Sequence, residues 1–143
     1  MAIRTANAAW QGSLVGGRGT MALQSGAYEG QYSFSSRFEE GTGSNPEELI
    51  AAAHAGCFSM ALSAVLTDGG HEPESVKTEA RVQILKEGEG FAIKKIDLVT
   101  RGRVPGIDAD AFEQAAQAAK ENCPVSLALA AVPEITLDAQ LES

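Results

Sequence analysis

The stretch LIAAAHAGCFSMALSAVL, residues 49–66, decides the fold, because it predicts a helix that is apolar or small on nearly every side. At about 18 residues it lies at the lower length limit for a membrane span. Polar side chains interrupt it and acidic residues flank it: His54, Ser59 and Ser63 inside, Glu47, Glu48 and Asp68 outside. Because basic flanks are absent, this pattern favours a buried core helix over a membrane span.

Capping signals give the bounds of this helix. Asn45 is a good N-cap residue, Pro46 suits the first helical position, and Glu48 follows the cap by three residues, as in a capping box. Gly69-Gly70 predicts the end of the helix after about Thr67.

Outward from the helix, alternating apolar residues and turn residues predict an α+β fold. The expected order is three strands, a helix, two strands, two helices and a strand. The predicted strands cover residues 3–10, 19–23, 31–38, 76–84, 91–103 and 134–141. Asp108 is expected to cap a helix that ends at Asn122, and a short helical piece is expected over residues 125–132. The first three strands should form an antiparallel meander.

A single chain cannot easily bury all the apolar sides of the central helix. One small sheet can cover only one side of a helix that is apolar all round. A second copy of the chain could cover the other side, since Ala51, Ala52, Ala53 and Gly56 would let two backbones approach closely. We therefore expect an obligate, intertwined homodimer with a buried central helix.

Length and composition indicate an ordinary globular protein. With 143 residues, the chain should be one domain, residues 1–143. The net charge of −8 argues against nucleic-acid binding, which needs a cationic face. No apolar run of the kind found in signal peptides follows Arg4, so a cytoplasmic location is expected. In that compartment two cysteines indicate chemistry or core packing more often than a structural disulfide.

Cys57 and Cys123 are the candidate reactive groups. Cys57 lies in the middle of the predicted helix, where a free cysteine can serve simply as a small buried hydrophobe. A reactive thiol there would need an Arg or Lys from another segment, because the helix dipole acts only near the helix ends. Cys123 precedes Pro124 at a break between helices, and the sequence leaves open whether it ends one helix or caps the next.

The spacing of the residues does not indicate a metal site or a phosphate-binding loop. His54 and Cys57 are three residues apart, but Cys123 has no second ligand nearby and His71 lies in a Gly-rich loop. The glycine-rich residues 15–20 lack the lysine and the spacing of a phosphate-binding loop. We therefore expect no metal and no cofactor.

Several motifs, in order along the whole chain, carry a resemblance to a known family. They are YSFSSRF at residues 32–38, NPEELI at 45–50, HAGCFSM at 54–60, VPGID at 104–108 and NCPVS at 122–126. Together they resemble the OsmC/Ohr family of osmotically inducible and organic-hydroperoxide-resistance proteins. The OsmC branch fits best, because of Arg37-Phe38 and His54.

The resemblance implies a thiol-dependent peroxidase that reduces organic hydroperoxides, and hydrogen peroxide less efficiently, at the expense of a thiol or dithiol. Cys57 matches the attacking cysteine, Cys123 the resolving cysteine, and Glu47 the catalytic glutamate that follows Asn-Pro. Arg37 matches the catalytic arginine of the OsmC branch, whereas Arg18 occupies the place of the arginine in the Ohr branch. We favour Arg37. It would supply the positive charge that Cys57 needs, and Glu47 would orient its guanidinium.

Helical spacing adds a geometric expectation. Glu47 and Cys57 are ten residues apart, so on one helix they lie roughly 15 Å from each other. Two antiparallel copies of the helix crossing near Ala52 would place Glu47 of one chain beside Cys57 of the other. By two-fold symmetry this predicts two active sites at the dimer interface.

Two other functions fit the same cysteines. In a redox sensor or ligand-binding protein, the pair would be oxidised without multiple turnover. In a purely structural domain, the cysteines would pack and react sluggishly with peroxide. Apolar walls such as Phe34, Phe38, Phe58 and Met60 would favour alkyl or lipid hydroperoxides as substrates.

Overall fold

The long helix α2 forms with the predicted N-cap, but the Glu48 side chain accepts from the Ser44 hydroxyl at 2.9 Å instead of closing the expected capping box. The computed structural model describes residues 1–142, in which α2 spans Pro46–Asp68. The Asn45 side chain accepts a hydrogen bond from the Glu48 backbone N–H at 2.7 Å, which confirms the predicted N-cap. At the other end Gly70 has a φ of 87°, a conformation that favours glycine, and the chain leaves the helix there.

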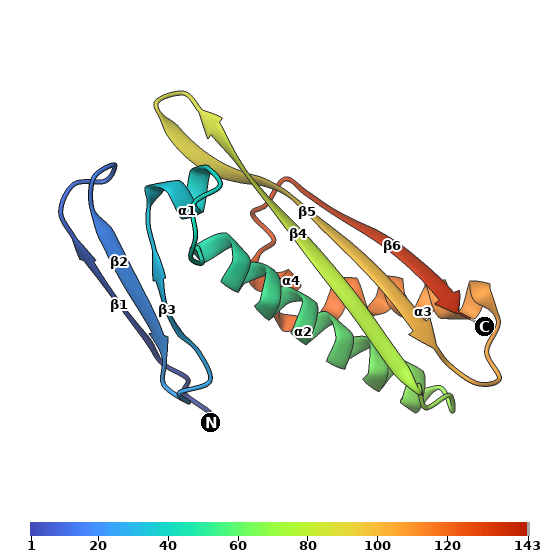
Figure 1. The fold of residues 1–143 in the computed structure, drawn as a ribbon. Helices are drawn as coiled ribbons and strands as arrows, with labels where there is room; N and C mark the ends of the chain where they lie inside the picture. Colours follow the sequence, from blue (N-terminus) through green and yellow to red (C-terminus); the bar gives the residue numbers. More distant parts are fainter. Residues whose placement is uncertain (143) are drawn as a thin grey trace. The chain divides into compact units, whose positions relative to one another are not determined.

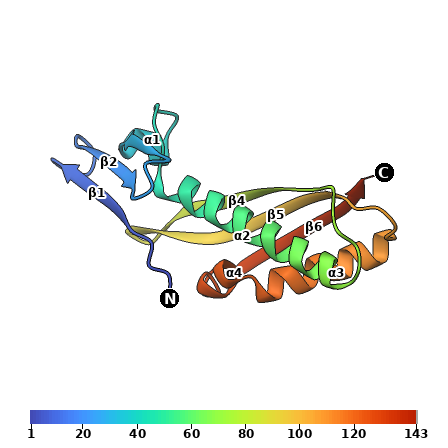
Figure 2. The same cartoon turned by 90° about the horizontal axis from the view of Figure 1, so that it is seen from below.

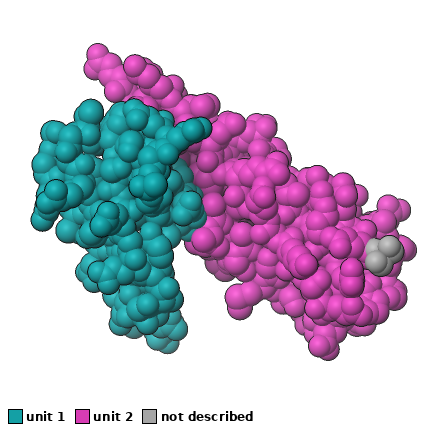
Figure 3. Space-filling view, in the orientation of Figure 1, with its two compact units in different colours: residues 1–49 teal, residues 50–143 magenta. Residues whose placement is uncertain are grey.

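The chain divides into two compact units, residues 1–49 (unit 1) and residues 50–143 (unit 2), coloured separately in Figure 3. Unit 1 contains a sheet of β1 (Ala6–Gln11), β2 (Arg18–Leu23) and β3 (Glu29–Tyr32), shown in blue in Figure 1. The strands pair antiparallel in the order β1-β2-β3. The predicted meander is therefore confirmed.

The third predicted strand, residues 31–38, is wrong beyond Tyr32. Phe34–Phe38 form a short helix, α1, because Ser33 starts a capping box. The Ser33 hydroxyl accepts from the Ser36 N–H at 3.2 Å, and the Ser36 hydroxyl accepts from the Ser33 N–H at 2.8 Å. Local side-chain to backbone bonds thus overcome the strand tendency of the phenylalanines.

Unit 2 contains a second three-stranded sheet. β4 (Ser75–Glu87) and β5 (Gly90–Arg103) form the predicted antiparallel hairpin, and β6 (Glu134–Glu142) pairs with β5 in parallel. The predicted strands 76–84, 91–103 and 134–141 are thus confirmed, with slightly longer bounds.

Two further helices complete unit 2. α3 spans Ala109–Asn122, and the Asp108 side chain caps it as predicted, accepting from the Ala111 N–H at 2.8 Å. α4 spans only Pro124–Ala128, shorter than the predicted 125–132. Residues 129–132 form a turn because Pro133 disfavours the helical conformation at the residue before it.

The core of unit 2 lies between one face of its sheet and helices α2 and α3 (Figures 1 and 2). Alternate residues of β5 face this core: Ile96, Leu98, Thr100 and Gly102 are buried. A Cβ at Gly102 would come within 2.4 Å of the Phe112 ring, so a glycine is needed for α3 to pack this closely. α2 contributes side chains at helical spacing from one face, namely Phe58, Leu62 and Leu66.

The opposite side of α2 is not covered by residues 50–142 of unit 2. Ala53, Gly56, Met60 and Ala64 are exposed there, Met60 to 76%. By length and composition α2 could cross a membrane, with a mean hydropathy of 1.8, but one such helix is weak evidence for a span. The expected burial of this helix is therefore found on one face only, and the homodimer stays a prediction.

Candidate functional site

The two cysteines, 66 residues apart in sequence, meet within unit 2. Cys57 lies on α2 and Cys123 lies between α3 and α4. Their sulfur atoms are 3.0 Å apart and both thiols are free. Cys123 is fully buried, whereas Cys57 is partly exposed, so a molecule from solvent can reach only Cys57 directly.

The sequence around Cys123 explains its position. Pro124 requires an extended conformation at the preceding residue, and Cys123 has φ −57° and ψ 124°. Its N–H still donates to Ala119 at the end of α3. Cys123 therefore both ends α3 and precedes α4, so the two alternatives left open by the sequence hold together.

The environment shifts the pKa values of the two thiols in opposite directions. For Cys57, burial is the largest cause and raises the pKa, the Cys123 thiol raises it further, and the Val125 N–H opposes both. For Cys123, burial also acts to raise the pKa, but hydrogen bonds from Cys57, Ser126 and Val125 outweigh it and lower the pKa. Within unit 2, no Lys or Arg among residues 50–142 contributes to the pKa of Cys57. An attacking thiolate at Cys57 therefore still needs the external cation that the sequence predicts.

A second side-chain pair, not foreseen from the sequence, lies close to the cysteines. His54 Nε2 and Ser126 Oγ are 2.7 Å apart, and both residues are buried. Burial lowers the pKa of His54, so this imidazole is neutral at neutral pH. A signal was present: His54 precedes Cys57 by three residues, and Ser126 follows Cys123 by three.

Arg37 and Glu47 come together within unit 1. Arg37 Nη2 lies 2.7 Å from Glu47 Oε1, and Arg37 Nε lies 3.1 Å from each carboxylate oxygen. The Glu47 side chain is 7% exposed and that of Arg37 is 34% exposed, so the carboxylate is held inside while the guanidinium keeps a free side. This is the paired, oriented guanidinium expected from the sequence.

An aromatic pocket of about 430 Å³ adjoins Arg37 in unit 1. Its walls are Trp10, Gly12, Leu14, Tyr32, Ser33, Phe34, Arg37 and Phe38. The Arg37 guanidinium lies over the Phe38 ring, 5.1 Å from its centre. Phe34 and Phe38 thus line a pocket, as expected, whereas Phe58 belongs to the core of unit 2 because it is fully buried.

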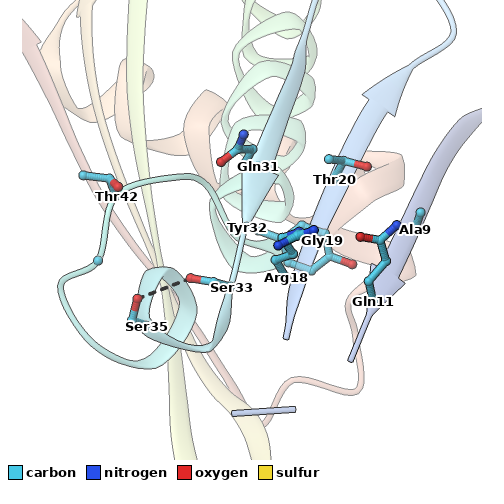
Figure 4. Close-up of a pocket in the computed structure, with 11 residues that line it drawn as sticks. Ala9, Gln11, Arg18, Gly19, Thr20, Gln31, Tyr32, Ser33, Ser35 and Thr42 are labelled. Atoms are coloured by element: carbon cyan, nitrogen blue, oxygen red, sulfur yellow. Dashed lines mark hydrogen bonds between the residues drawn. The ribbon is translucent and has the colours of Figure 1, made fainter. Parts of the chain in front are cut away.

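Arg18, the alternative arginine, lies in a different pocket of unit 1. This pocket of about 480 Å³ has both polar and apolar walls, and Figure 4 shows Arg18 there with Gln11 and Gln31. Among residues 1–142 no ion pair is found for Arg18, while Glu47 pairs with Arg37. Of these two arginines, Arg37 is the one that Glu47 holds, and its role stays a prediction.

No group of three or more His, Cys, Asp or Glu residues that could hold a metal ion occurs among residues 1–142. Unit 2 can support thiol chemistry at Cys57 and Cys123. Unit 1 holds a guanidinium paired with a carboxylate, Arg37 and Glu47.

Comparison with known proteins identifies the family. The model of the OsmC-like protein family matches residues 39–138. The chain is 52% identical over 135 residues to Peroxiredoxin OsmC of Escherichia coli K12, covering 94% of this chain and 93% of that protein. It is 36% identical over 98 residues to the organic hydroperoxide resistance protein of Xanthomonas axonopodis pv. citri, covering 68% of this chain and 67% of that one.

The fold agrees with this assignment. The crystal structure of the organic hydroperoxide resistance protein OhrB of Bacillus subtilis superposes with a TM-score of 0.71 at 26% identity, covering 96% of this chain and 98% of that one. With a matching family model, a relative at 52% identity and a common fold, the chain belongs to the OsmC-like family.

Proposed function

We propose that the protein is a thiol-dependent peroxidase that reduces organic hydroperoxides in the cytoplasm. The observation that carries this proposal is the pair of free thiols 3.0 Å apart, one reachable from solvent and one buried. The names of its relatives, a peroxiredoxin and organic hydroperoxide resistance proteins, support the same function.

In the proposed reaction, the Cys57 thiolate attacks the terminal oxygen of the hydroperoxide. The O–O bond breaks, an S–O bond forms, and the alkoxide takes a proton and leaves as an alcohol. The Cys123 sulfur then attacks the resulting sulfenic acid, and a disulfide forms as water leaves. A thiol or dithiol reduces this disulfide by exchange and returns the enzyme to its starting state.

The proposed activating cation is Arg37, held by Glu47. A guanidinium within about 4–6 Å of a thiol favours the thiolate, which is the effect that the burial of Cys57 requires. Since Glu47 and Cys57 are ten residues apart on α2, we propose that Arg37 and Glu47 act on Cys57 of a partner chain. Two such sites would then form in a symmetric homodimer.

The aromatic pocket beside Arg37 supports an apolar substrate. A hydroperoxide with an aryl or alkyl body could bury it against Trp10, Phe34 and Phe38, while its O–O group reaches toward the guanidinium. Hydrogen peroxide has no apolar part, so burial in this pocket would not add to its binding free energy.

A peroxidase assay tests the proposed function. With a dithiol as reductant, kcat/KM for cumene hydroperoxide should exceed that for hydrogen peroxide by at least about tenfold, because burial of the ring contributes more than about 1.4 kcal/mol. The assay measures thiol oxidation with each peroxide in excess reductant. One stoichiometric oxidation without turnover would instead indicate a redox sensor, and no oxidation at all would indicate a structural domain.

Sedimentation tests the proposed dimer. At micromolar concentration the wild-type chain should sediment at twice its mass of 14.9 kDa. Ala53→Arg places a charge on the exposed apolar face of α2 and should dissociate the dimer. Gln114→Arg adds the same charge on an exposed position of α3 and serves as the matched control. A folded wild-type monomer at this concentration would contradict the proposal.

A further inference from the structure

The hydrogen bond between His54 and Ser126 and the close contact between the sulfur atoms of Cys57 and Cys123 join the same two segments of unit 2. His54 stands three residues before Cys57 on α2, and Ser126 stands three residues after Cys123 on α4. The two pairs thus connect the same two segments, one helical turn apart. His54 is 0% exposed and Ser126 is 7% exposed, so water does not compete for their 2.7 Å hydrogen bond.

The hydrogen-bond pattern decides which nitrogen of His54 carries the proton. Nδ1 is buried and has no hydrogen-bond partner among residues 1–142. A proton on Nδ1 would leave a buried N–H without an acceptor, which is costlier than a bare lone pair. The proton therefore lies on Nε2, and His54 donates to Ser126 Oγ.

Because its oxygen already accepts from His54, the Ser126 hydroxyl hydrogen is free to donate elsewhere. Ser126 is the third residue after Cys123, the position from which a side chain reaches back to the residue that starts a helical turn. Both the hydroxyl and the N–H of Ser126 act to lower the pKa of Cys123.

We propose that Ser126, oriented by His54, is a positioning residue that stabilises the thiolate of Cys123 for the resolving step. In this proposal His54 Nε2–H donates to Ser126 Oγ, and the Ser126 O–H donates to Cys123 Sγ once that sulfur is a thiolate. This inference rests on the proposed function, since it concerns the second half of that reaction.

The resolving step forms one S–S bond and breaks one S–O bond. The Cys123 thiol loses its proton, its sulfur attacks the sulfenic sulfur of Cys57, and an S–S bond forms as the S–O bond breaks. The departing hydroxide takes up one proton, so the net products are a disulfide and water. Ser126 and His54 are unchanged, and they stabilise the anion only before the attack.

The first test titrates Cys123 alone. In a Cys57→Ser background, the pH dependence of the thiolate absorbance of Cys123 near 240 nm, which needs no reagent to reach this buried sulfur, should move upward by about one to two pH units when Ser126→Ala is added. This follows because a hydrogen bond to a charged group is worth that much in pKa. Ser126→Thr keeps the hydroxyl and should restore the profile. An unchanged profile in the Ser126→Ala chain would overturn the proposal, and this test does not depend on peroxidase activity.

The second test follows the resolving step. After one equivalent of cumene hydroperoxide, disulfide formation competes with dimedone trapping of the sulfenic acid, and mass spectrometry gives the ratio. At pH 7, Ser126→Ala should slow disulfide formation about three- to tenfold. The loss of thiolate is partly offset by the higher nucleophilicity of a more basic sulfur. At pH 10 the difference should vanish, whereas a packing defect would slow the step at every pH.

His54 variants and a control complete the design. His54→Gln keeps an N–H donor toward Ser126 and should resolve faster at pH 7 than His54→Leu, which decides the question if Ser126→Ala does not fold. Ser59→Ala removes another 2.7 Å hydroxyl bond of α2, to Thr78, and should leave the resolving step unchanged. Equal slowing in Ser59→Ala, or equal rates in the two His54 variants, would overturn the proposal. Absence of peroxide consumption by the wild-type chain would instead refute the proposed function.

Discussion

Cys57→Ser is expected to reduce peroxide consumption to the background rate, whereas Cys123→Ser should complete about one turnover and stop as a sulfenic acid. The reason is the unequal access of the two sulfur atoms, since Cys57 is partly exposed and Cys123 is fully buried. Removing the nucleophile removes the first chemical step, and removing the resolving thiol removes only the second.

Stoichiometric peroxide titration measures this difference. Each chain is mixed with a small excess of cumene hydroperoxide without reductant, and the remaining peroxide and the mass of the protein are determined. Cys123→Ser should gain one oxygen atom, or one dimedone adduct when the trap is present, and Cys57→Ser should gain neither. If the Cys57→Ser chain consumed peroxide and the Cys123→Ser chain did not, the two roles would be reversed.

Arg37→Gln is expected to lower the rate of Cys57 oxidation at pH 7 by roughly 10- to 1,000-fold. A neighbouring cation lowers the pKa of an acid by about one to three units, and this contribution would be lost. Burial and the Cys123 thiol, which raise the pKa of Cys57, would then act unopposed except by the Val125 N–H. The alkylation profile of Cys57 should shift to higher pH by the same amount.

Two matched variants separate this effect from a general loss of charge. Arg101→Gln breaks another arginine–carboxylate pair, with Asp138 at 3.3 Å, and should leave the profile of Cys57 unchanged. Arg18→Gln should also have little effect, because Glu47 pairs with Arg37. A larger loss in Arg18→Gln than in Arg37→Gln would assign activation to Arg18 instead.

Mixed dimers test whether the site is shared between chains. Cys57→Ser chains and Arg37→Gln chains should each be impaired alone, yet a mixed dimer contains one site with both native residues. Random mixing should therefore restore roughly a quarter of the wild-type activity, since about half of the dimers are mixed and each has one complete site. No recovery on mixing would show that Arg37 acts within its own chain.

Much of the fold could be predicted because the local signals are strong. Asn45 and Asp108 cap their helices, Gly70 ends α2, and alternation identifies the strands of unit 2. The errors lie where short-range hydrogen bonds compete with propensity. At Ser33 a capping box turns an apparent strand into α1, and before Pro133 a helix gives way to a turn. Such competition depends on a few side-chain hydrogen bonds, which leave no periodic pattern in the sequence.

The candidate site was predictable in its residues but not in its geometry. Cys57, Cys123, Arg37 and Glu47 were singled out by motif resemblance, and the structure groups them as two pairs. The bond between His54 and Ser126 joins residues 72 apart in sequence. Sequence spacing places each of them beside a cysteine, but only the packing of α4 on α2 makes them partners.

The short separation of the sulfur atoms bears on how the protein would survive its own substrate. A sulfenic acid that waits for its partner can react with a second peroxide and become a sulfinic acid, a lesion that ordinary thiols do not repair. Because Cys123 Sγ is only 3.0 Å from Cys57 Sγ, the disulfide between them can form with little movement of the chain. Such an enzyme should keep its activity at peroxide concentrations that would inactivate an enzyme whose disulfide forms more slowly.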